Sequence, residues 1–420
     1  MSESTIEDDV QRVMSARGTG PGTRGIRVQC CVQECSKTVR KLRLHIRKFH
    51  KERCPLSCSP CQERFVGQND LNNHHGNGCH KSLSLIESFF KNVDFSECSA
   101  VDDFITKELR LDKASRKAVS KAVDLLYKHL QENLPSPFSI QNLVKGGSFG
   151  KKTAVKDKAD IDCVLFLNNV KTMKEHKRNL PETKDCLESC LKQSPHKHQI
   201  IFDGRTPFAV KFKLRPDLSP SREFDIDLLP TFTTTDLESR EQRYRLYEEM
   251  IECEKEDKGY YSAHLVKLQK TFVKDQPQIV KDLIRLVKYW RKTCVEDKST
   301  GKPRLPSSYP LELITIDCWE NAAGKTSFDI RAGFKAVLER LVDNCHIHVI
   351  WHKYYDEALA ERGFKMSKSP PFVLDPANPT NNVCSASDAE GWKTVADVAD
   401  MTLQRQPLKD INFNKNWQII

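Results

Sequence analysis

The stretch that decides the fold is KGGSFGKKT at residues 145–153, followed by the apolar run DIDCVLFL at residues 160–167. Glycines in the first run allow backbone N–H groups to approach phosphate oxygens, and Ser148 can donate a further hydrogen bond. In an expected strand, Asp160 and Asp162 are two residues apart and therefore face the same side. Hard carboxylate oxygens next to substrate phosphates favour Mg²⁺. The sequence thus predicts a phosphate-binding loop followed by a metal-binding strand.

This loop differs from a Walker P-loop. A Walker motif has four residues between its glycines and a Ser or Thr directly after the Lys. Here three residues separate Gly146 from Gly150, and Lys152 follows Lys151. We therefore do not expect a P-loop nucleoside triphosphatase.

A further pair of carboxylates lies in the run EFDIDLLP at residues 223–230. Asp225 and Asp227 also share one face of an expected strand, so either can supply a third acid from a neighbouring strand. Three acids can hold two metal ions, of which one lowers the pKa of an attacking hydroxyl and the other stabilises a leaving pyrophosphate. One of the carboxylates can also accept the hydroxyl proton.

Six of the 16 cysteines fall within residues 30–61, and this crowding predicts zinc binding. The second Cys/His cluster combines a Cys-x2-Cys knuckle with a helical histidine, and Phe65 and Leu71 supply its small core. Its predicted ligands are Cys58, Cys61, His74 and either Cys79 or His80, with His75 a lesser candidate.

A first cluster precedes it. Its predicted ligands are Cys31 (or Cys30), Cys35, His45 and His50. The helix expected at residues 40–48 is very basic, so it contacts phosphates or forms the solvated face of a protein-interaction finger.

Composition sets wider limits. The formal net charge is +10, with 38% hydrophobic and 30% charged residues, which is typical of a folded protein that favours polyanions. No apolar run approaches the ~18 residues of a membrane span. The first ten residues are acidic and polar rather than a signal peptide, so we expect a cytoplasmic or nuclear protein with reduced cysteines.

Periodicity predicts helices near residues 83–90, 116–130, 262–274 and 278–293, and strands at 161–167, 207–214 and 223–229. The predicted organisation is a disordered tail (1–26), a zinc-finger segment (27–80), a catalytic lobe (81–234) and a helical lobe (235–420).

These motifs resemble the nucleotidyltransferase superfamily with a polymerase-β-like core, and within it the 2′-5′-oligoadenylate synthetases. The resemblance spans roughly residues 95–420. It extends to LIRLVKYW at 283–290, YPLELITIDCWE at 309–320, WHKYYD at 351–356 and VLDPANPTNN at 373–382.

The resemblance implies an α+β fold, bilobal, with a mixed-sheet catalytic lobe and a helical C-terminal lobe. It implies synthesis of 2′-5′-linked oligoadenylates from ATP with release of pyrophosphate, activated by double-stranded RNA, in innate antiviral sensing. The zinc-finger segment is outside the usual family plan.

The resemblance also assigns residues. The implied Mg²⁺ ligands and catalytic acids are Asp160, Asp162 and Asp227, with Asp225 as the fallback for the third. The implied nucleotide contacts are Gly147, Ser148, Lys151, Arg285, Lys288 and Tyr309, where lysine meets phosphate and Tyr309 stacks on the base. The implied RNA contacts are Lys145, Lys270 and Lys274.

Several positions depart from the family pattern. Lys152 replaces a usual Gly, Gln278 replaces a Thr that helps hold RNA, and residues 412–415 lack the Cys-Phe-Lys motif linked to oligomer assembly. Two alternative functions remain: a cyclic-dinucleotide synthase, or a catalytically inactive RNA-binding protein. Cys345, His346, His348 and His352 alternate along an apolar run, which favours core and surface positions over a metal site.

Overall fold

The computed structural model describes residues 10–11, 28–29, 38–39, 54, 56–58, 64–76, 79–156, 159–216, 223–233, 237–295, 303–322, 324, 326–364 and 370–419. The chain forms two compact units, residues 1–91 and 92–420.

Among its described residues, the first unit has two short antiparallel strand pairs followed by helices. The elements are β1 (Val28–Gln29), β2 (Thr38–Val39), β3 (Leu56–Ser57), β4 (Arg64–Phe65) and α3 (Gln68–Gly76). Helix α3 packs against β3 and β4, and Phe65 and Leu71 are buried. Helix α4 (Cys79–Asn92) follows and buries Leu83, Ile86 and Phe89, as the helical spacing predicts.

The second unit is built on a five-stranded sheet of order β5-β6-β9-β8-β7. The strands are β5 (Ile140–Lys145), β6 (Asp160–Leu167), β7 (Ile200–Arg205), β8 (Val210–Leu214) and β9 (Phe224–Phe232). Strands β6 and β9 are parallel and the other pairs are antiparallel, so the sheet is mixed.

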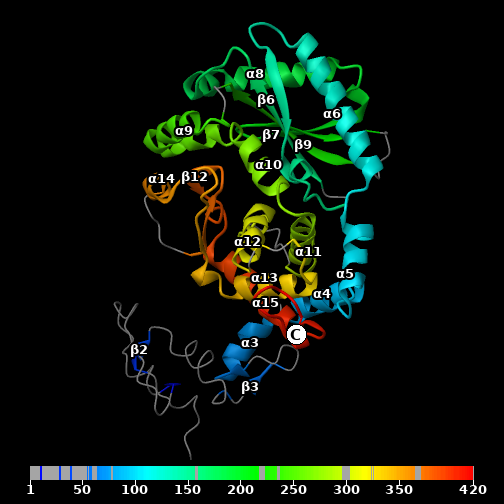
Figure 1. Cartoon of the computed structure of the whole chain (residues 1–420), viewed down its shortest axis with the longest axis vertical. Helices are drawn as coiled ribbons and strands as arrows, with labels where there is room; N and C mark the ends of the chain where they lie inside the picture. The colour runs from blue at the N-terminus through cyan, green and yellow to red at the C-terminus, as the bar shows by residue number, and fades with distance from the viewer. Residues whose placement is uncertain are drawn as a thin grey trace, which may run out of the picture. The chain divides into compact units, whose positions relative to one another are not determined.

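Two helices cover one face of this sheet (Figure 1). They are α6 (Lys113–Asn133) and α8 (Met173–Gln193). Leu126 of α6 and Leu191 of α8 meet Phe212 and Ile226 of the sheet across a small apolar cavity. Because side chains alternate along each strand, the polar residues of β6, β8 and β9 lie on the opposite face. There, Val144 and Val164 pack against Ala263 and Val266.

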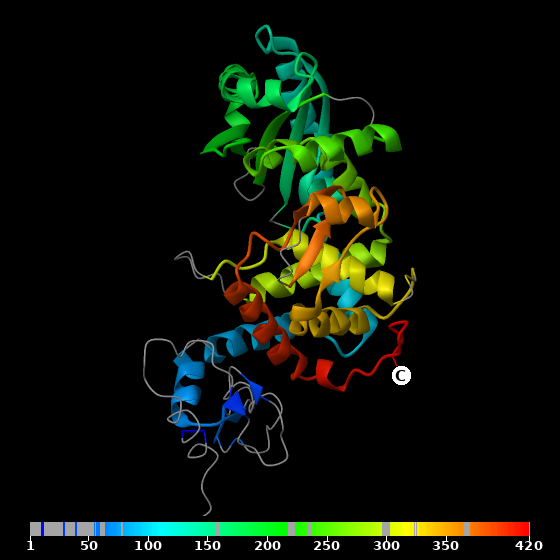
Figure 2. The same cartoon turned by 90° about the vertical axis from the view of Figure 1, so that its left-hand side faces the viewer.

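The other described helices of residues 92–420 form a helical lobe, except that the two at residues 240–252 and 266–274 lie between this lobe and the sheet (Figures 1 and 2). They are α5 (Cys98–Phe104), α9 (Arg240–Glu252), α10 (Val266–Lys274), α11 (Gln278–Cys294), α12 (Ser308–Asn321), α13 (Ile330–Val342), α14 (Glu357–Gly363) and α15 (Ala389–Leu403). A small sheet of β10 (His348–Val349), β11 (Phe372–Asp375) and β12 (Asn378–Asn382) accompanies them. Helix α11 is central: it packs on α12 and α13, and Trp290 donates to Thr402 of α15 at 3.0 Å.

The predicted α+β fold with a mixed sheet and a helical C-terminal lobe is confirmed. One helix begins later than expected: α10 starts at Val266 rather than near Ser262. His264, just before it, is buried, stacks on Phe232 and hydrogen-bonds the Phe232 carbonyl at 3.0 Å, which holds this segment against the sheet.

The two outer strands, β5 and β7, escaped prediction because polar residues interrupt their apolar alternation, which edge strands tolerate. The glycine-rich turn forms a single helical turn, α7 (Gly147–Lys151). None of the helices in the described ranges is both long and apolar enough to span a bilayer.

Candidate active site

Four carboxylates gather where β6 and β9 begin, on the sheet face opposite α6 and α8. In the parallel register, Asp160 lies opposite Asp225 and Asp162 lies opposite Asp227. Neighbouring strands are about 4.8 Å apart, so the four side chains form one cluster, which we call the acid face. Asp225 is 68% exposed and Asp227 37% exposed, so Asp227 lies deeper in the cluster.

The carboxylates of the acid face repel one another, although Lys211 lies 3.6 Å from Asp227 and Lys213 lies 3.7 Å from Asp225. Burial and the nearby Asp160 raise the pKa of Asp162 to about 6, and Asp227 acts in the same direction while Lys151 opposes it. Burial also raises the pKa of Asp227, against the effect of Lys211. A divalent cation removes this repulsion, so the donor set fits Mg²⁺ through its chemistry and its charge.

The predicted phosphate-binding loop lies directly on β6. Gly147 has φ +60°, and a Cβ there would come within 2.7 Å of the Asp160 carbonyl oxygen and 3.0 Å of the Asp162 nitrogen. The Gly146 N–H donates to the Asp162 carbonyl at 2.7 Å, and the Ser148 hydroxyl donates to the Asp160 carboxylate. Only glycine fits at 147, so the loop and the acid face form one unit.

Two predicted phosphate-binding lysines meet at one buried acid. The Glu312 carboxylate on α12 lies 3.2 Å from the Lys151 ammonium and 3.1 Å from that of Lys288, and it accepts from the Thr153 hydroxyl at 2.8 Å. We call these four residues the Glu312 pocket. Burial alone would raise the pKa of Glu312, but the two lysines and Thr153 lower it to about 2. The carboxylate is therefore ionised, and phosphates must compete with it for both ammonium groups.

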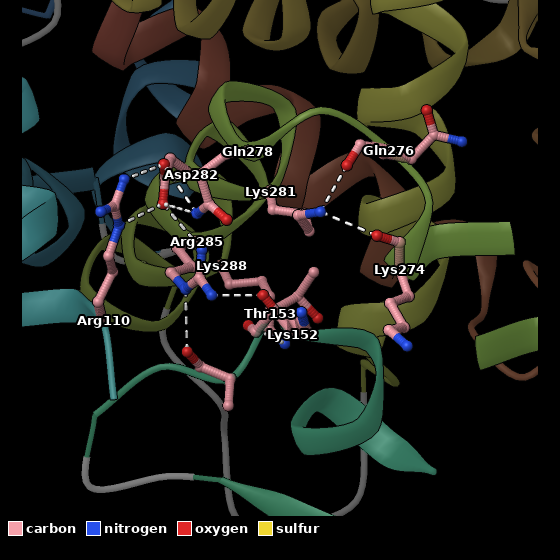
Figure 3. Close-up of polar contacts among 11 residues, drawn as sticks. Arg110, Lys152, Thr153, Lys274, Gln276, Gln278, Lys281, Asp282, Arg285 and Lys288 are labelled. Atoms are coloured by element: carbon pink, nitrogen blue, oxygen red, sulfur yellow. Dashed lines mark hydrogen bonds and ion pairs between the residues drawn. The ribbon is translucent and has the colours of Figure 1, made fainter. Parts of the chain in front are cut away.

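Arg285, another predicted nucleotide contact, holds protein groups instead (Figure 3). Its buried guanidinium donates to the carbonyls of Lys152 and Ala154 and to Asp282, at 3.1 Å for Ala154 and 2.8 Å for Asp282. Asp282 also accepts from Arg110 and, at 3.1 Å, from Gln278. Arg285 thus fixes the segment after the phosphate-binding loop to helix α11.

Tyr309, the predicted base-stacking residue, is next to the loop. The Lys151 ammonium lies 3.6 Å from the centre of its ring. Its hydroxyl is buried beside Asp375 without a well-aligned hydrogen bond, and the two groups shift each other's pKa. Asp375 accepts from Gln269 at 2.6 Å and from the Ala377 N–H at 2.9 Å, while burial raises its pKa to about 6.

The three predicted RNA-binding lysines lie near one another. Burial lowers the pKa of Lys270, and repulsion from Lys274 and Lys145 adds to this effect. The Lys145 ammonium is bound to α6, at 2.8 Å from the Ser120 hydroxyl and 2.7 Å from Asp124.

Lys281 of α11 is buried and donates to the backbone carbonyls of Lys274, at 2.8 Å, and of Gln276 (Figure 3). The C-terminal end of α10, which carries Lys270 and Lys274, is therefore attached to α11.

The predicted zinc ligands are only partly described. Cys58 is buried directly after β3, as is Cys54 before it. His74 lies on α3 and Cys79 begins α4, but their side chains are outside the described residues. Cys31, Cys35, His45, His50, Cys61 and the Cys30 and His80 alternatives also lie outside what the structure describes, either wholly or in their side chains.

The histidines near residue 346 are divided between different environments. His348 stacks on Phe372, with ring centres 4.8 Å apart. His346 and Cys345 are exposed beside Asp343, and both Asp343 and Cys345 approach the same His346 nitrogen, Nδ1, at 2.6 and 3.5 Å. Asp343, Cys345 and His346 thus form a small exposed cluster of their own.

Sequence reasoning missed four charged residues of the site: Glu312, Asp375, Asp282 and Lys211. A signal existed for Lys211, because the run at 207–214 alternates apolar and basic residues, which places Lys211 and Lys213 on one face of a strand. Glu312 and Asp375 gave no such signal, since each is a single acid within an apolar segment.

The fold has a counterpart among solved structures. It is similar to a chain in the structure of the E. coli MS115-1 CdnC:HORMA-deltaN complex, with a TM-score of 0.50 and 16% sequence identity, covering 75% of this chain and 94% of that chain. The mixed sheet, its loop and the acid face define a nucleotidyltransferase.

Sequence comparison identifies the family within the nucleotidyltransferases. The chain is 33% identical to 2′-5′-oligoadenylate synthase 1A of Mus musculus over 319 residues, which is 72% of this chain and 85% of that protein. It is 34% identical to 2′-5′-oligoadenylate synthase 1A of Rattus norvegicus over 327 residues, 72% of this chain and 89% of that protein. The family model described as 2′-5′-oligoadenylate synthetase 1, domain 2, C-terminus, matches residues 240–420. The chain therefore belongs to the 2′-5′-oligoadenylate synthase family.

Proposed function

We propose that this chain joins ATP molecules into 2′-5′-linked oligoadenylates, that Asp160, Asp162 and Asp227 bind two Mg²⁺ ions for this reaction, and that double-stranded RNA activates it. The acid face is the observation that carries the proposal. Its carboxylates repel one another, they lie on adjacent parallel strands, and a phosphate-binding loop rests on one of those strands.

In the proposed reaction, the 2′-hydroxyl oxygen of an acceptor adenylate bonds to the α-phosphorus of a donor ATP. The bond from that phosphorus to the bridging oxygen of the β-phosphate breaks, and pyrophosphate leaves. Bound Mg²⁺ would lower the pKa of the hydroxyl and stabilise the leaving group. Asp227 accepts the hydroxyl proton directly or through water.

The remaining residues bind and orient the donor. Ser148 and the glycine backbone lie over β6, where they can donate to phosphate oxygens. The ammonium groups of Lys151 and Lys288 leave the Glu312 carboxylate and bind phosphate oxygens of the donor. The adenine base stacks on the face of the Tyr309 ring that the Lys151 ammonium occupies in this structure. Departure of Lys151 toward the phosphates clears the ring for the base.

Activation by RNA is supported by the cluster of Lys145, Lys270 and Lys274 and by the attachment of α10 to α11 through Lys281. We also propose zinc at Cys58, Cys61, His74 and Cys79. The hairpin β3–β4 followed by α3, with Phe65, Leu71 and Cys58 buried, supports a finger-like segment there.

The test is turnover of ATP with Mg²⁺, with and without duplex RNA, with products resolved by chromatography and a nuclease specific for 3′-5′ bonds. RNA-dependent, nuclease-resistant linear adenylates support the proposal. A cyclic dinucleotide would replace the product assignment, and RNA-independent synthesis would remove the activator. No pyrophosphate under any condition would overturn the catalytic proposal.

A further inference from the structure

A row of cations continues the acid face onto the next strand. Strand β8 is antiparallel to β9, with Lys211 opposite Asp227 and Lys213 opposite Asp225. Directly opposed residues share a face, so both lysines lie on the same side of the sheet as the acids. Their side chains are 37% and 38% exposed, which leaves both within reach of a ligand.

The two lysines differ in their partners. The Lys213 ammonium is 2.7 Å from Glu223, an acid that also pairs with Arg215 at 2.8 Å. Lys213 also lies 3.7 Å from Asp225, and Lys211 lies 3.6 Å from Asp227. Partly exposed ion pairs of this kind contribute little to folding, so stability does not explain a lysine beside a catalytic acid. Once Asp227 binds a divalent cation, its charge is shared with that cation and the Lys211 ammonium is available to another anion.

The position of Lys211 indicates which anion. The loop of Ser148 and Lys151 rests on β6, and Lys151 is close enough to Asp162 to lower its pKa. Lys211 lies on β8, beyond Asp227 on the other side of the acid face. Nucleotidyl transfer needs the attacking and leaving oxygens on opposite sides of the phosphorus. If the donor's pyrophosphate leaves toward the Lys151 side, the acceptor approaches from the Lys211 side.

We propose that Lys211 binds the 5′-phosphates of the acceptor, so that the site selects phosphorylated acceptors over dephosphorylated ones. The inference rests on the proposed function, because it assigns the second nucleotide of that reaction. The ligand of the Lys211 ammonium is a phosphate oxyanion attached to the adenylate whose hydroxyl attacks.

The experiment uses the full-length chain with Mg²⁺, duplex RNA, labelled ATP as donor and a 2′-5′ diadenylate as acceptor, either 5′-triphosphorylated or dephosphorylated. The readout is the ratio of kcat/KM for the two acceptors. Losing one charge-assisted phosphate contact corresponds to roughly tenfold, so Lys211→Met should lower this ratio about tenfold. Lys211→Arg keeps the charge and should restore most of it.

Lys213→Met is the matched control. Lys213 is on the same face of the same strand, but it lies opposite Asp225 rather than Asp227. Its ratio should stay within about twofold of the unaltered chain, a change too small for a lost charge-assisted contact. An unchanged ratio in Lys211→Met, or an equal fall in Lys213→Met, overturns the assignment to Lys211. If the unaltered chain transfers adenylate to neither acceptor, the proposed function is overturned. This outcome is distinguishable from failure of the Lys211 assignment, because it does not depend on the variants.

Discussion

The acid face and the Glu312 pocket use the same functional groups in opposite ways. On the acid face, Asp160, Asp162 and Asp227 repel one another, and the pKa of Asp162 rises to about 6. In the Glu312 pocket, two lysines surround one carboxylate and its pKa falls to about 2. Negative charge therefore stays in excess where divalent cations are proposed to bind, and it is balanced by two lysines where no nucleotide has yet displaced them.

The largest expected effect is a loss of activity on substitution in the acid face. Asp162→Asn removes one proposed metal ligand, so nucleotidyl transfer should fall by about 10³-fold or more. Folding should not suffer, because the substitution relieves repulsion from Asp160 and Asp227. Steady-state assays with Mg²⁺ and thermal unfolding without it measure the two effects.

Asp225→Asn is the matched control for that change. Asp225 is more exposed than Asp227 and pairs with Lys213 at 3.7 Å. We expect it to retain activity within about tenfold, as for a charge near but not on the metal ions. If Asp225→Asn abolishes transfer while Asp227→Asn does not, the third ligand is Asp225.

Substitution in the Glu312 pocket should lower the free energy of unfolding. Glu312→Gln leaves the mostly buried ammonium groups of Lys151 and Lys288 without their counter-charge, which should cost about 3 kcal/mol of unfolding free energy. Urea unfolding at neutral pH measures it. Glu320→Gln, on the same helix but exposed, should leave stability nearly unchanged. Equal losses in both variants would mean that the Glu312 pairs contribute nothing specific.

Asp375 gives a smaller effect that depends on pH. It is buried like Glu312, but it accepts hydrogen bonds from the neutral Gln269 and Ala377, and burial outweighs the opposing charge of Lys151 to raise its pKa to about 6 from an ordinary value of 3.8. The folded state therefore holds this proton more tightly, and the stabilisation is present at low pH and lost as pH rises through about 6. Asp375→Asn removes this dependence.

Between pH 4.5 and 7.5, the unfolding free energy of Asp375→Asn relative to the unaltered chain should rise by about 2 kcal/mol. Urea unfolding at the two pH values provides the measurement. A difference that stays constant across this range would contradict the raised pKa.

The two regions also differ in how far the sequence predicts them. Period-two spacing in residues 160–167 and 223–230 is local, so the shared faces of Asp160 with Asp162 and of Asp225 with Asp227 followed from the sequence alone. The glycine-rich loop was equally predictable from sequence. Position 147 has a left-handed backbone close to β6, so only a residue without a side chain fits there.

The Glu312 pocket was not predictable in this way. It joins Lys151 to Glu312 across 161 residues of sequence, and no local period reports such a contact. Likewise, the apolar pattern of α11 predicts a buried helix, but not that Asp282 and Arg285 would be buried among its apolar residues as a pair. The family resemblance placed Arg285 at the nucleotide, whereas here its guanidinium binds the loop backbone.

The smallest expected effect applies the same distinction to the RNA-binding prediction. Lys274 has an exposed side chain, whereas the Lys145 ammonium is already paired with Asp124 and Ser120. An open cation releases counterions from duplex RNA more fully than a paired one. Lys274→Ala should therefore lower the slope of log K against log salt by about 1, and Lys145→Ala by clearly less. Equilibrium binding to one duplex across a salt series measures both slopes. Equal reductions would mean that RNA breaks the Lys145 pair on binding, and no reduction in either would place the RNA elsewhere on the chain.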